Sequence, residues 1–406
     1  MTSTLTAKSL LLLVCLGAFA TGPAYSQSKT PSDVPPIQQP TRAMVWNPQS
    51  AAKYLDDRQT WWMNWPESAR DHQTFCVSCH TVVPYALAKP RLGSTLGRPE
   101  PTATDTRLLE NVTVRVNGWK DMQPFYSDEK VGPHKTAQSR GTESILNALI
   151  LSSFEQAAAQ PSAVLQQAFH NMWAEQQRKG ESKGAWLWLN FHTQPWEADD
   201  SPYFGATLAA VAVGTAPGQY FKRSEIQGQL RDLREYLQRG QEKRSLNNRV
   251  LLLWASTEIP DLLKPEQQQA IIDALASQQR PDGGWSMTSL VGNWQRGDGT
   301  PLETKSDGYA TGLVCLAAKQ AGVPETDVHL KKGLTWLATH QDKSQGLWPG
   351  YSLNKQRPPS ADAFLFMTDA ATGYSILALT SPAKQQVNAG RSRPDTTEHS
   401  NINGHD

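Results

Sequence analysis

The chain has 406 residues, with 39 Lys and Arg against 38 Asp and Glu, and a formal net charge of +1. Hydrophobic residues make up 38% of the sequence, which is enough to bury a sizeable core in a chain of this length. The near-zero charge gives no long-range field of either sign, so neither nucleic acid nor an anionic membrane surface is expected as a partner.

The first segment, residues 1–26, has the composition of a secretory signal. Lys8 precedes the apolar run Leu10–Ala20, and small residues follow at Ala24–Ser26. The apolar run is well below the roughly 20 residues that a membrane span needs, which favours a cleaved signal over a retained anchor. Cys15 lies inside this segment and is expected to be removed with it. The sequence therefore predicts an exported, periplasmic protein, with an uncleaved anchor as the alternative.

Both ends of the mature chain lack a pattern that could form a core. Residues 27–43 are rich in proline and polar residues and are predicted to form an extended linker. Residues 381–406 are polar, show no apolar periodicity and are predicted to be a disordered tail. Between them we expect a haem-binding segment at 44–140 and helical repeats at 141–380.

The motif Cys76-Val77-Ser78-Cys79-His80 has the spacing that covalent haem attachment requires. Two thiols three positions apart can bond to haem as thioethers, and the adjacent imidazole of His80 can bind the iron. A tetrahedral zinc site would need a second ligand pair, and a thioredoxin-like dithiol would sit in a βαβ pattern; neither is found. The sequence predicts one covalent haem c held by Cys76, Cys79 and His80, and the cytochrome c maturation machinery as a partner.

The sixth iron ligand is the least determined part of this site. Met122, between Trp119 and Phe125, is the first choice, and Met63, His72 and His134 are the alternatives. Each of them also fits an ordinary packing or surface role. An open sixth position, which would permit peroxide or oxygen chemistry, is a further alternative. Aromatic and branched residues near the motif offer apolar cover: Trp61, Trp62, Trp65, Phe75, Val82, Val83 and Tyr85.

Short helices that begin with a capping residue and continue with small apolar residues recur along the body. Their starts lie about 45 to 60 residues apart, which is the length of a helical hairpin with its loops. Small residues allow close approach of helices, as the inner ring of a helical toroid demands. The predicted starts are Thr142, Ser201, Ser306 and Thr368, with a weaker copy at Ser245.

A second element of the repeat runs from a glutamine through a glycine to a tryptophan. The best copies end at Trp285 and Trp348, and a looser copy ends at Trp186. Glycine ends the preceding helix, the indole covers that end, and the glutamine bonds the freed backbone groups. We therefore expect a structural role for all three tryptophans, in preference to stacking on a substrate.

These Gln-to-Trp repeats resemble those of the squalene-hopene cyclase and protein prenyltransferase superfamily. The resemblance covers roughly residues 177–379 and implies an all-α fold, an (α/α)6 toroid of the terpenoid-cyclase type. The haem motif lies where later repeats carry their glutamine and tryptophan, which favours a haem segment integrated into the first repeat over a separate N-terminal cytochrome domain. The Asp, Cys and His metal pattern of prenyltransferases is not evident.

The resemblance also raises the question of cyclase chemistry. Class II cyclases protonate an alkene with an Asp-x-Asp-Asp motif, and this chain has Glu197-Ala198-Asp199-Asp200, an imperfect match. Acidic residues recur at the same place in other repeats as Glu143, Asp307 and Asp369, where a negative charge favours a helix N-terminus. We therefore expect these residues to serve helix capping, with an acidic ligand-facing rim and cyclase catalysis as the alternatives.

The functional expectation is a periplasmic, mono-haem, cytochrome-like protein that exchanges electrons with another periplasmic redox protein. Two alternatives stay open: a haem enzyme that oxidises an apolar, terpenoid-like molecule in the toroid cavity, and a non-catalytic binding module. The remaining thiol, Cys315, lies in an apolar run and is expected to be a small buried residue.

Overall fold

The computed structural model describes residues 46–384, so the predicted signal, the linker and residues 385–406 lie outside the described part. The described part is helical, with no β-strand and only isolated bridges. Its α-helices are α1 (Pro48–Asn64), α2 (Val82–Thr95), α3 (Ala103–Asn117), α4 (Asp128–Val131), α5 (Lys135–Phe154), α6 (Ala163–Glu175), α7 (Ser201–Thr215), α8 (Gln227–Gln238), α9 (Leu246–Glu258), α10 (Pro265–Ser277), α11 (Met287–Val291), α12 (Gly308–Gln320), α13 (Val328–Thr339) and α14 (Phe366–Thr380).

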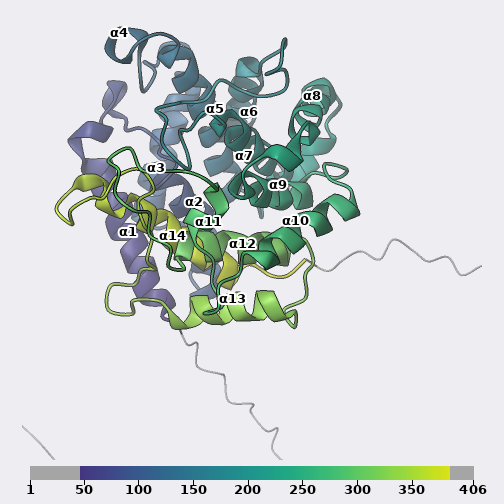
Figure 1. Ribbon diagram of the computed structural model, residues 1–406. Helices are drawn as coiled ribbons and strands as arrows, with labels where there is room; N and C mark the ends of the chain where they lie inside the picture. Colours follow the sequence, from purple (N-terminus) through teal and green to yellow (C-terminus); the bar gives the residue numbers. More distant parts are fainter. Residues whose placement is uncertain (1–45, 385–406) are drawn as a thin grey trace, which may run out of the picture. The chain divides into compact units, whose positions relative to one another are not determined.

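Within the described residues, six helices form a closed inner ring. Helix α2 packs on α5, α5 on α7, α7 on α9, α9 on α12, α12 on α14, and α14 back on α2. Six outer helices alternate with them along the chain: α1, α3, α6, α8, α10 and α13. Outer helices such as α1, α8, α10 and α13 lie at the edge of the view in Figure 1. The predicted all-α, (α/α)6 toroid is confirmed.

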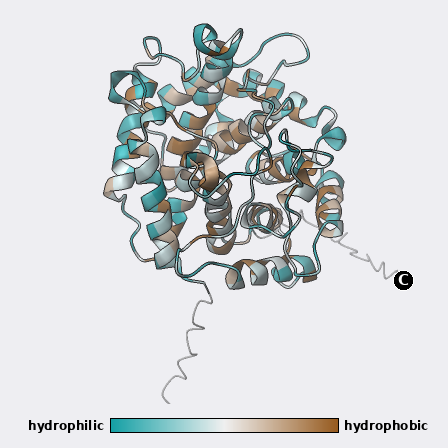
Figure 2. Ribbon diagram, turned by 60° about the vertical axis from the view of Figure 1, so that its left-hand side comes forward, coloured by the Kyte–Doolittle hydropathy of each residue, from teal (hydrophilic) through white to brown (hydrophobic). Residues whose placement is uncertain are grey.

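The two rings differ in hydropathy because they differ in burial. Inner helix α7 is apolar on all sides, and nearly all its side chains are buried. Outer helix α8 buries one stripe, Leu230, Leu233 and Leu237, and exposes polar residues elsewhere. Figure 2 shows the same contrast, with mostly brown helices in the middle and teal residues at the edge.

The glutamine, glycine and tryptophan of each repeat fasten one outer helix to the next. Trp285 Nε1 donates to the carbonyl of Leu275 in α10 at 2.7 Å, and Gln279 Nε2 donates to the carbonyls of Gly283 and His329 at 2.8 Å each. The copies at Gln176 and Trp186 and at Gln341 and Trp348 make the equivalent bonds. The predicted structural role of the three tryptophans is confirmed.

The last copy closes the ring between the two ends of the body. Gln341 exchanges two hydrogen bonds with the backbone of Asn47, at 2.6 and 3.0 Å, just before α1. Gly346 has φ +80°, and a Cβ there would lie 2.0 Å from the carbonyl oxygen of Ser50. Only glycine allows the last repeat to approach α1 this closely.

We predict that Gly346→Ala destabilises the protein by at least about 2 kcal/mol more than Gly299→Ala does. Both glycines have positive φ, but a Cβ at Gly299 meets nothing within 4 Å, so this control carries only the backbone cost. Urea unfolding of both variants measures the difference. Equal losses would mean that the contact with Ser50 does not hold the ring closed.

Residues 44–140, expected to be the haem segment, contribute α1, α2 and α3 to the ring. The inner helix α2 was not expected, since Pro84 and Pro90 interrupt its pattern. Helix α5 begins at Lys135 rather than at the expected Thr142. At the other end, residues 381–384 of the expected tail are attached to the body, where Lys384 Nζ pairs with Glu258 at 2.8 Å.

Within residues 46–384, one helical stretch, Asp362–Thr380, has the length and hydropathy that suit a membrane span. It contains the inner helix α14, and most of its side chains are buried within the protein. A core helix of a soluble protein meets the same criterion, so this stretch is weak support for a membrane span.

Candidate functional site

The Cys76–His80 segment lies just before α2 and is fastened by its backbone to two outer helices. Trp62 Nε1 of α1 donates to the carbonyl of Cys76 at 2.8 Å. Asn111 of α3 makes two hydrogen bonds with the backbone of Phe75, at 2.8 and 3.0 Å. The segment is therefore an integral part of the toroid's first repeat.

His80 is surrounded by aromatic rings from distant parts of the chain. Its imidazole stacks on Phe366 at the start of α14, with ring centroids 3.7 Å apart and planes at 15°. Trp62 meets it edge-on at 5.0 Å, and Trp196 lies 5.6 Å away. We call the place where residues 76–81, residues 191–197 and Phe366 meet the ring mouth.

The ionisable groups of the motif are neutral because they lie deep in the protein. Burial raises the pKa of Cys76 to about 12 and also raises the pKa of Cys79. Burial, with a smaller contribution from the Arg58 charge, lowers the pKa of His80 to about 3. Cys79 and His80 nevertheless keep part of their surface accessible, and neither thiol forms a disulfide.

The candidate sixth ligands are spread over several elements. Met122 is buried, and its methyl group packs against Gly118 at the end of α3. Met63 is buried in α1. His72 is exposed, with φ 54°, and its Nδ1 lies 3.1 Å from Asp71; His134 precedes α5 with φ 68°. No interaction recorded among the described residues joins any of the four to His80.

The loop of residues 191–197, considered in the sequence only for its acidic motif, contributes Trp196 to the ring mouth. Gln194 exchanges two hydrogen bonds with Asn354, at 2.6 and 2.9 Å, and so ties residues 191–197 to the segment before α14. Trp196 Nε1 donates to the hydroxyl of Tyr309 at 3.1 Å. Glu197 is half-buried, and burial raises its pKa to about 7 against the opposing effects of Thr193 and Lys135.

We predict that Glu197 makes folding stability fall as pH rises. Between its ordinary pKa of 4.5 and about 7, the folded chain keeps a proton that the unfolded chain has released. In the wild type this proton release lowers the free energy of unfolding by at most about 1.4 kcal/mol per pH unit, and Glu197→Gln should abolish that dependence. Urea unfolding at several pH values, with Glu100→Gln at an exposed position as the control, measures this. A curve for Glu197→Gln parallel to that of the wild type would refute it.

The recurring acidic residues have different roles, so the capping prediction holds only in part. Asp307 caps α12 by accepting from the backbone of Ala310 at 2.8 Å. Glu143 lies inside α5, because that helix starts earlier than expected, and pairs with the buried Arg115. Asp200 accepts from Asn248 at 2.7 Å instead of bonding its own helix.

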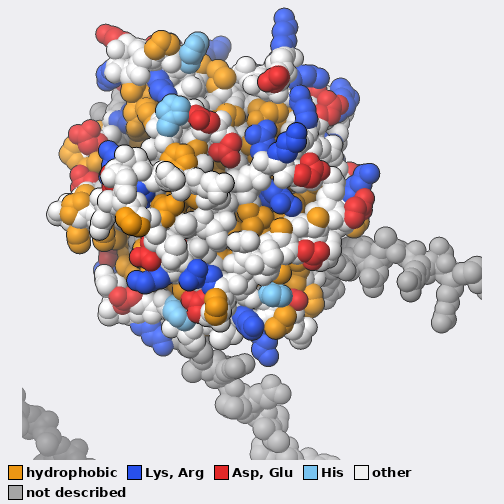
Figure 3. Space-filling view, in the orientation of Figure 1, with side chains coloured by type: hydrophobic (Ala, Val, Ile, Leu, Met, Phe, Trp, Pro, Cys, Tyr) orange, Lys and Arg blue, Asp and Glu red, His pale blue; other side chains and the backbone are white. Residues whose placement is uncertain are grey.

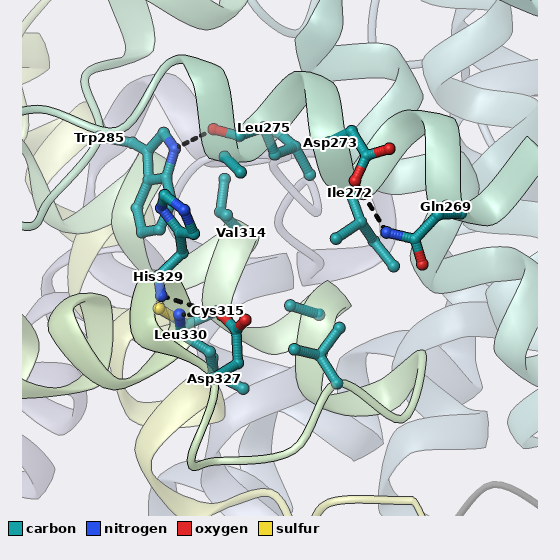
Figure 4. Close-up of a pocket in the computed structure, with 13 residues that line it drawn as sticks. Gln269, Ile272, Asp273, Leu275, Trp285, Val314, Cys315, Asp327, His329 and Leu330 are labelled. Atoms are coloured by element: carbon teal, nitrogen blue, oxygen red, sulfur yellow. Dashed lines mark hydrogen bonds between the residues drawn. The ribbon is translucent and has the colours of Figure 1, made fainter.

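The expected burial of Cys315 is confirmed, and its thiol lines a cavity of about 200 Å³ between α10, α12 and α13. Figure 4 shows His329 beside Trp285 and Cys315, with Asp273 on the opposite wall. This cavity lies in the outer wall and includes no residue of the haem motif. Within the described residues, no group of three or more His, Cys, Asp and Glu is arranged to hold a metal ion.

The face of the molecule shown in Figure 3 carries no large patch of one charge. Acidic and basic side chains are interspersed over the face that Figure 3 shows, in keeping with the net charge of +1. No single class of charged partner is indicated by this face.

No protein-family model and no curated protein matches this chain. Among solved structures, a polysaccharide lyase is similar, with 12% identity and a TM-score of 0.48; the match covers 82% of this chain and 96% of the lyase. An unsaturated glucuronyl hydrolase from a Bacillus species has 10% identity and a TM-score of 0.48, over 81% of this chain and 94% of the hydrolase. These similarities concern the fold, and the resemblance to terpenoid cyclases stays a prediction.

The predicted cytochrome-like electron-transfer function is corrected. The solved structures named above are a polysaccharide lyase and an unsaturated glucuronyl hydrolase, which are not electron-transfer proteins. In the structure the motif segment is held by α1 and α3 of the first repeat, through Trp62 and Asn111. It lies inside the ring mouth, with Phe366 and Trp196 against His80. Support for a haem group comes from the residues of this chain alone.

Proposed function

We propose that this chain is a binding protein for one covalent haem c, held in the ring mouth by Cys76, Cys79 and His80. Electron transfer is not part of the proposal. The observation that carries it is that the imidazole of a Cys-x-x-Cys-His motif meets a cluster of aromatic rings and that Cys79 and His80 keep accessible surface.

The two thiols and the imidazole of the motif suit covalent attachment of haem. Each cysteine is a free, protonated thiol, and a thiol adds across a vinyl group by bonding sulfur to one carbon and giving its hydrogen to the other. His80 is neutral, as a metal ligand must be, and Phe366 fixes its ring plane. When bound, haem supplies iron that can bind small ligands and undergo redox chemistry.

Export of the chain, predicted from residues 1–26, would deliver it to the periplasm, where the maturation machinery attaches haem. The test is to produce the full chain with its signal beside that machinery, unfold the product, extract it with acidified acetone and record a pyridine haemochrome spectrum. Noncovalent haem leaves in the extract. We expect a c-type spectrum to stay with the protein, and a colourless protein would overturn the proposal.

A second candidate function, acid–base catalysis in the ring mouth, is favoured by Glu197. A half-buried carboxyl that stays protonated near neutral pH can donate a proton to a bound substrate. Trp61 and Trp65, stacked at 5.2 Å and partly exposed, offer flat apolar surfaces beside Phe366. Carbohydrates are the first substrates to assay, with Glu197→Gln as the inactive comparison. Cleavage that survives in Glu197→Gln would exclude this role.

A further inference from the structure

We infer that Thr81, held by Asp369, fixes the tautomer of His80, so that Nδ1 carries the ring proton and Nε2 offers its lone pair to the haem iron. The part of this inference that concerns iron rests on the proposed function. The tautomer of the imidazole does not, because it is a property of the polypeptide itself.

The side chains form a continuous chain of hydrogen bonds. His80 Nδ1 lies 2.9 Å from Thr81 Oγ1, and Thr81 Oγ1 lies 2.7 Å from Asp369 Oδ2. Thr81 and Asp369 are 2% and 1% exposed, so water does not compete for these bonds. Although 288 positions separate Thr81 from Asp369, the packing of α2 on α14 brings them together.

The donors around Asp369 determine which way each proton points. Arg58 donates to both carboxylate oxygens, from Nε at 2.8 Å and from Nη2 at 3.0 Å, and Tyr54 donates at 2.8 Å. Burial raises the pKa of Asp369, and the bidentate bonds and charge of Arg58 oppose that rise. Paired with the guanidinium, the carboxylate is ionised and can only accept. Thr81 must therefore use its single proton toward Asp369. Its lone pairs are left to accept, so His80 Nδ1 must donate.

A neutral imidazole has one ring proton, so a proton on Nδ1 leaves Nε2 unprotonated. Metal-binding histidines commonly donate their second ring N–H to a fixed acceptor, which orients the ring and raises the basicity of the ligating nitrogen. Here a hydroxyl polarised by a buried carboxylate is the acceptor. Thr81 and Asp369 are thus positioning residues, and His80 is the residue that touches the iron.

The first test is long-range ¹H–¹⁵N NMR of the full chain produced without haem and labelled at its nine histidines, with the His80 signals assigned by His80→Gln. We expect an Nδ1–H tautomer in the wild type and in Thr81→Ser, and loss of that single tautomer in Thr81→Val. Thr335→Val, at an exposed position, is the matched control and should leave the spectrum unchanged. An Nε2–H tautomer in the wild type, or an unchanged His80 signal in Thr81→Val, would overturn the inference.

The second test uses the haem-loaded chain. Without the polarised hydrogen-bond acceptor, Nε2 gives its electron pair to the iron less strongly, which stabilises ferric iron less. Thr81→Val should therefore have a more positive midpoint potential than the wild type, while the potential of Thr81→Ser should stay close to that of the wild type. Equal potentials in Thr81→Val and the wild type would refute the effect on the iron. If the wild type carries no haem, the proposed function fails, and the NMR result still decides the tautomer of His80.

Discussion

When produced beside the maturation machinery, the double variant Cys76→Ser/Cys79→Ser should acquire no covalently bound haem, whereas Cys315→Ser should carry it. Serine is close to cysteine in size, and both motif residues lie in a backbone segment held by Trp62 and Asn111. The exchange therefore removes the sulfur atoms while keeping the segment in place. We expect a complete loss of extraction-resistant haem, since no other thiol lies near the ring mouth within the described residues.

The control variant separates thiol chemistry in general from the motif in particular. Cys315 is also a buried thiol, but it lines the outer-wall cavity beside Trp285. Absorption spectra of the extracted proteins compare the three chains. Covalent haem in the double variant would contradict the account, and so would its loss in Cys315→Ser with the fold intact.

Arg115→Met should destabilise the protein by about 3–5 kcal/mol, because it leaves the carboxylate of Glu143 buried without its partner. The Arg115 side chain is 0% exposed, and its Nη2 lies 2.9 Å from Glu143 Oε2. Nη1 of the same arginine also donates to Thr74, two positions before Cys76, at 2.7 Å. The variant should therefore also loosen the start of the motif segment.

Two further variants separate the effect of the buried ion pair from the effect of losing a charge. Arg115→Met/Glu143→Gln removes both charges and should recover part of the loss. Lys53→Met breaks the exposed pair with Asp57 and should cost about 1 kcal/mol or less. Urea unfolding measures all three variants. If Arg115→Met lowers the free energy of unfolding by no more than Lys53→Met does, the ion pair between Arg115 of α3 and Glu143 of α5 does not stabilise the ring.

The toroid was predictable from sequence because its repeats are local. A glutamine, a glycine and a tryptophan within a dozen residues bond the end of the helix before them, and the copies ending at Trp285 and Trp348 show this arrangement in both sequence and structure. The pattern predicts an outer helix and its termination. The inner helix that follows is marked by its small apolar residues, as in α7 and α12.

Local patterns were less informative where proline or an early start altered the repeat. Pro84 and Pro90 obscured α2, whose interior proline is tolerated within the ring. Helix α5 starts at Lys135, seven residues before the expected Thr142, and this places Glu143 inside the helix rather than at its cap. The carboxylate then pairs with Arg115 of the neighbouring helix α3, a contact that no spacing rule indicates.

The candidate site shows the same division between local and distant signals. Cys76, Cys79 and His80 were identified from five consecutive residues, whereas Asp369, Phe366 and Trp196 reach His80 or Thr81 only through ring closure. Thr81 was overlooked although it directly follows His80. A hydroxyl beside a candidate metal-binding histidine is the signal that would have indicated a hydrogen-bonded Nδ1.

Mass spectrometry of the full chain matured in the periplasm tests the central claim most directly. After removal of the signal, the intact mass should exceed that of the polypeptide by one haem, and digestion should locate the added mass on the peptide that contains Cys76, Cys79 and His80. A polypeptide of unmodified mass, with both thiols free to react with an alkylating reagent after unfolding, would contradict it.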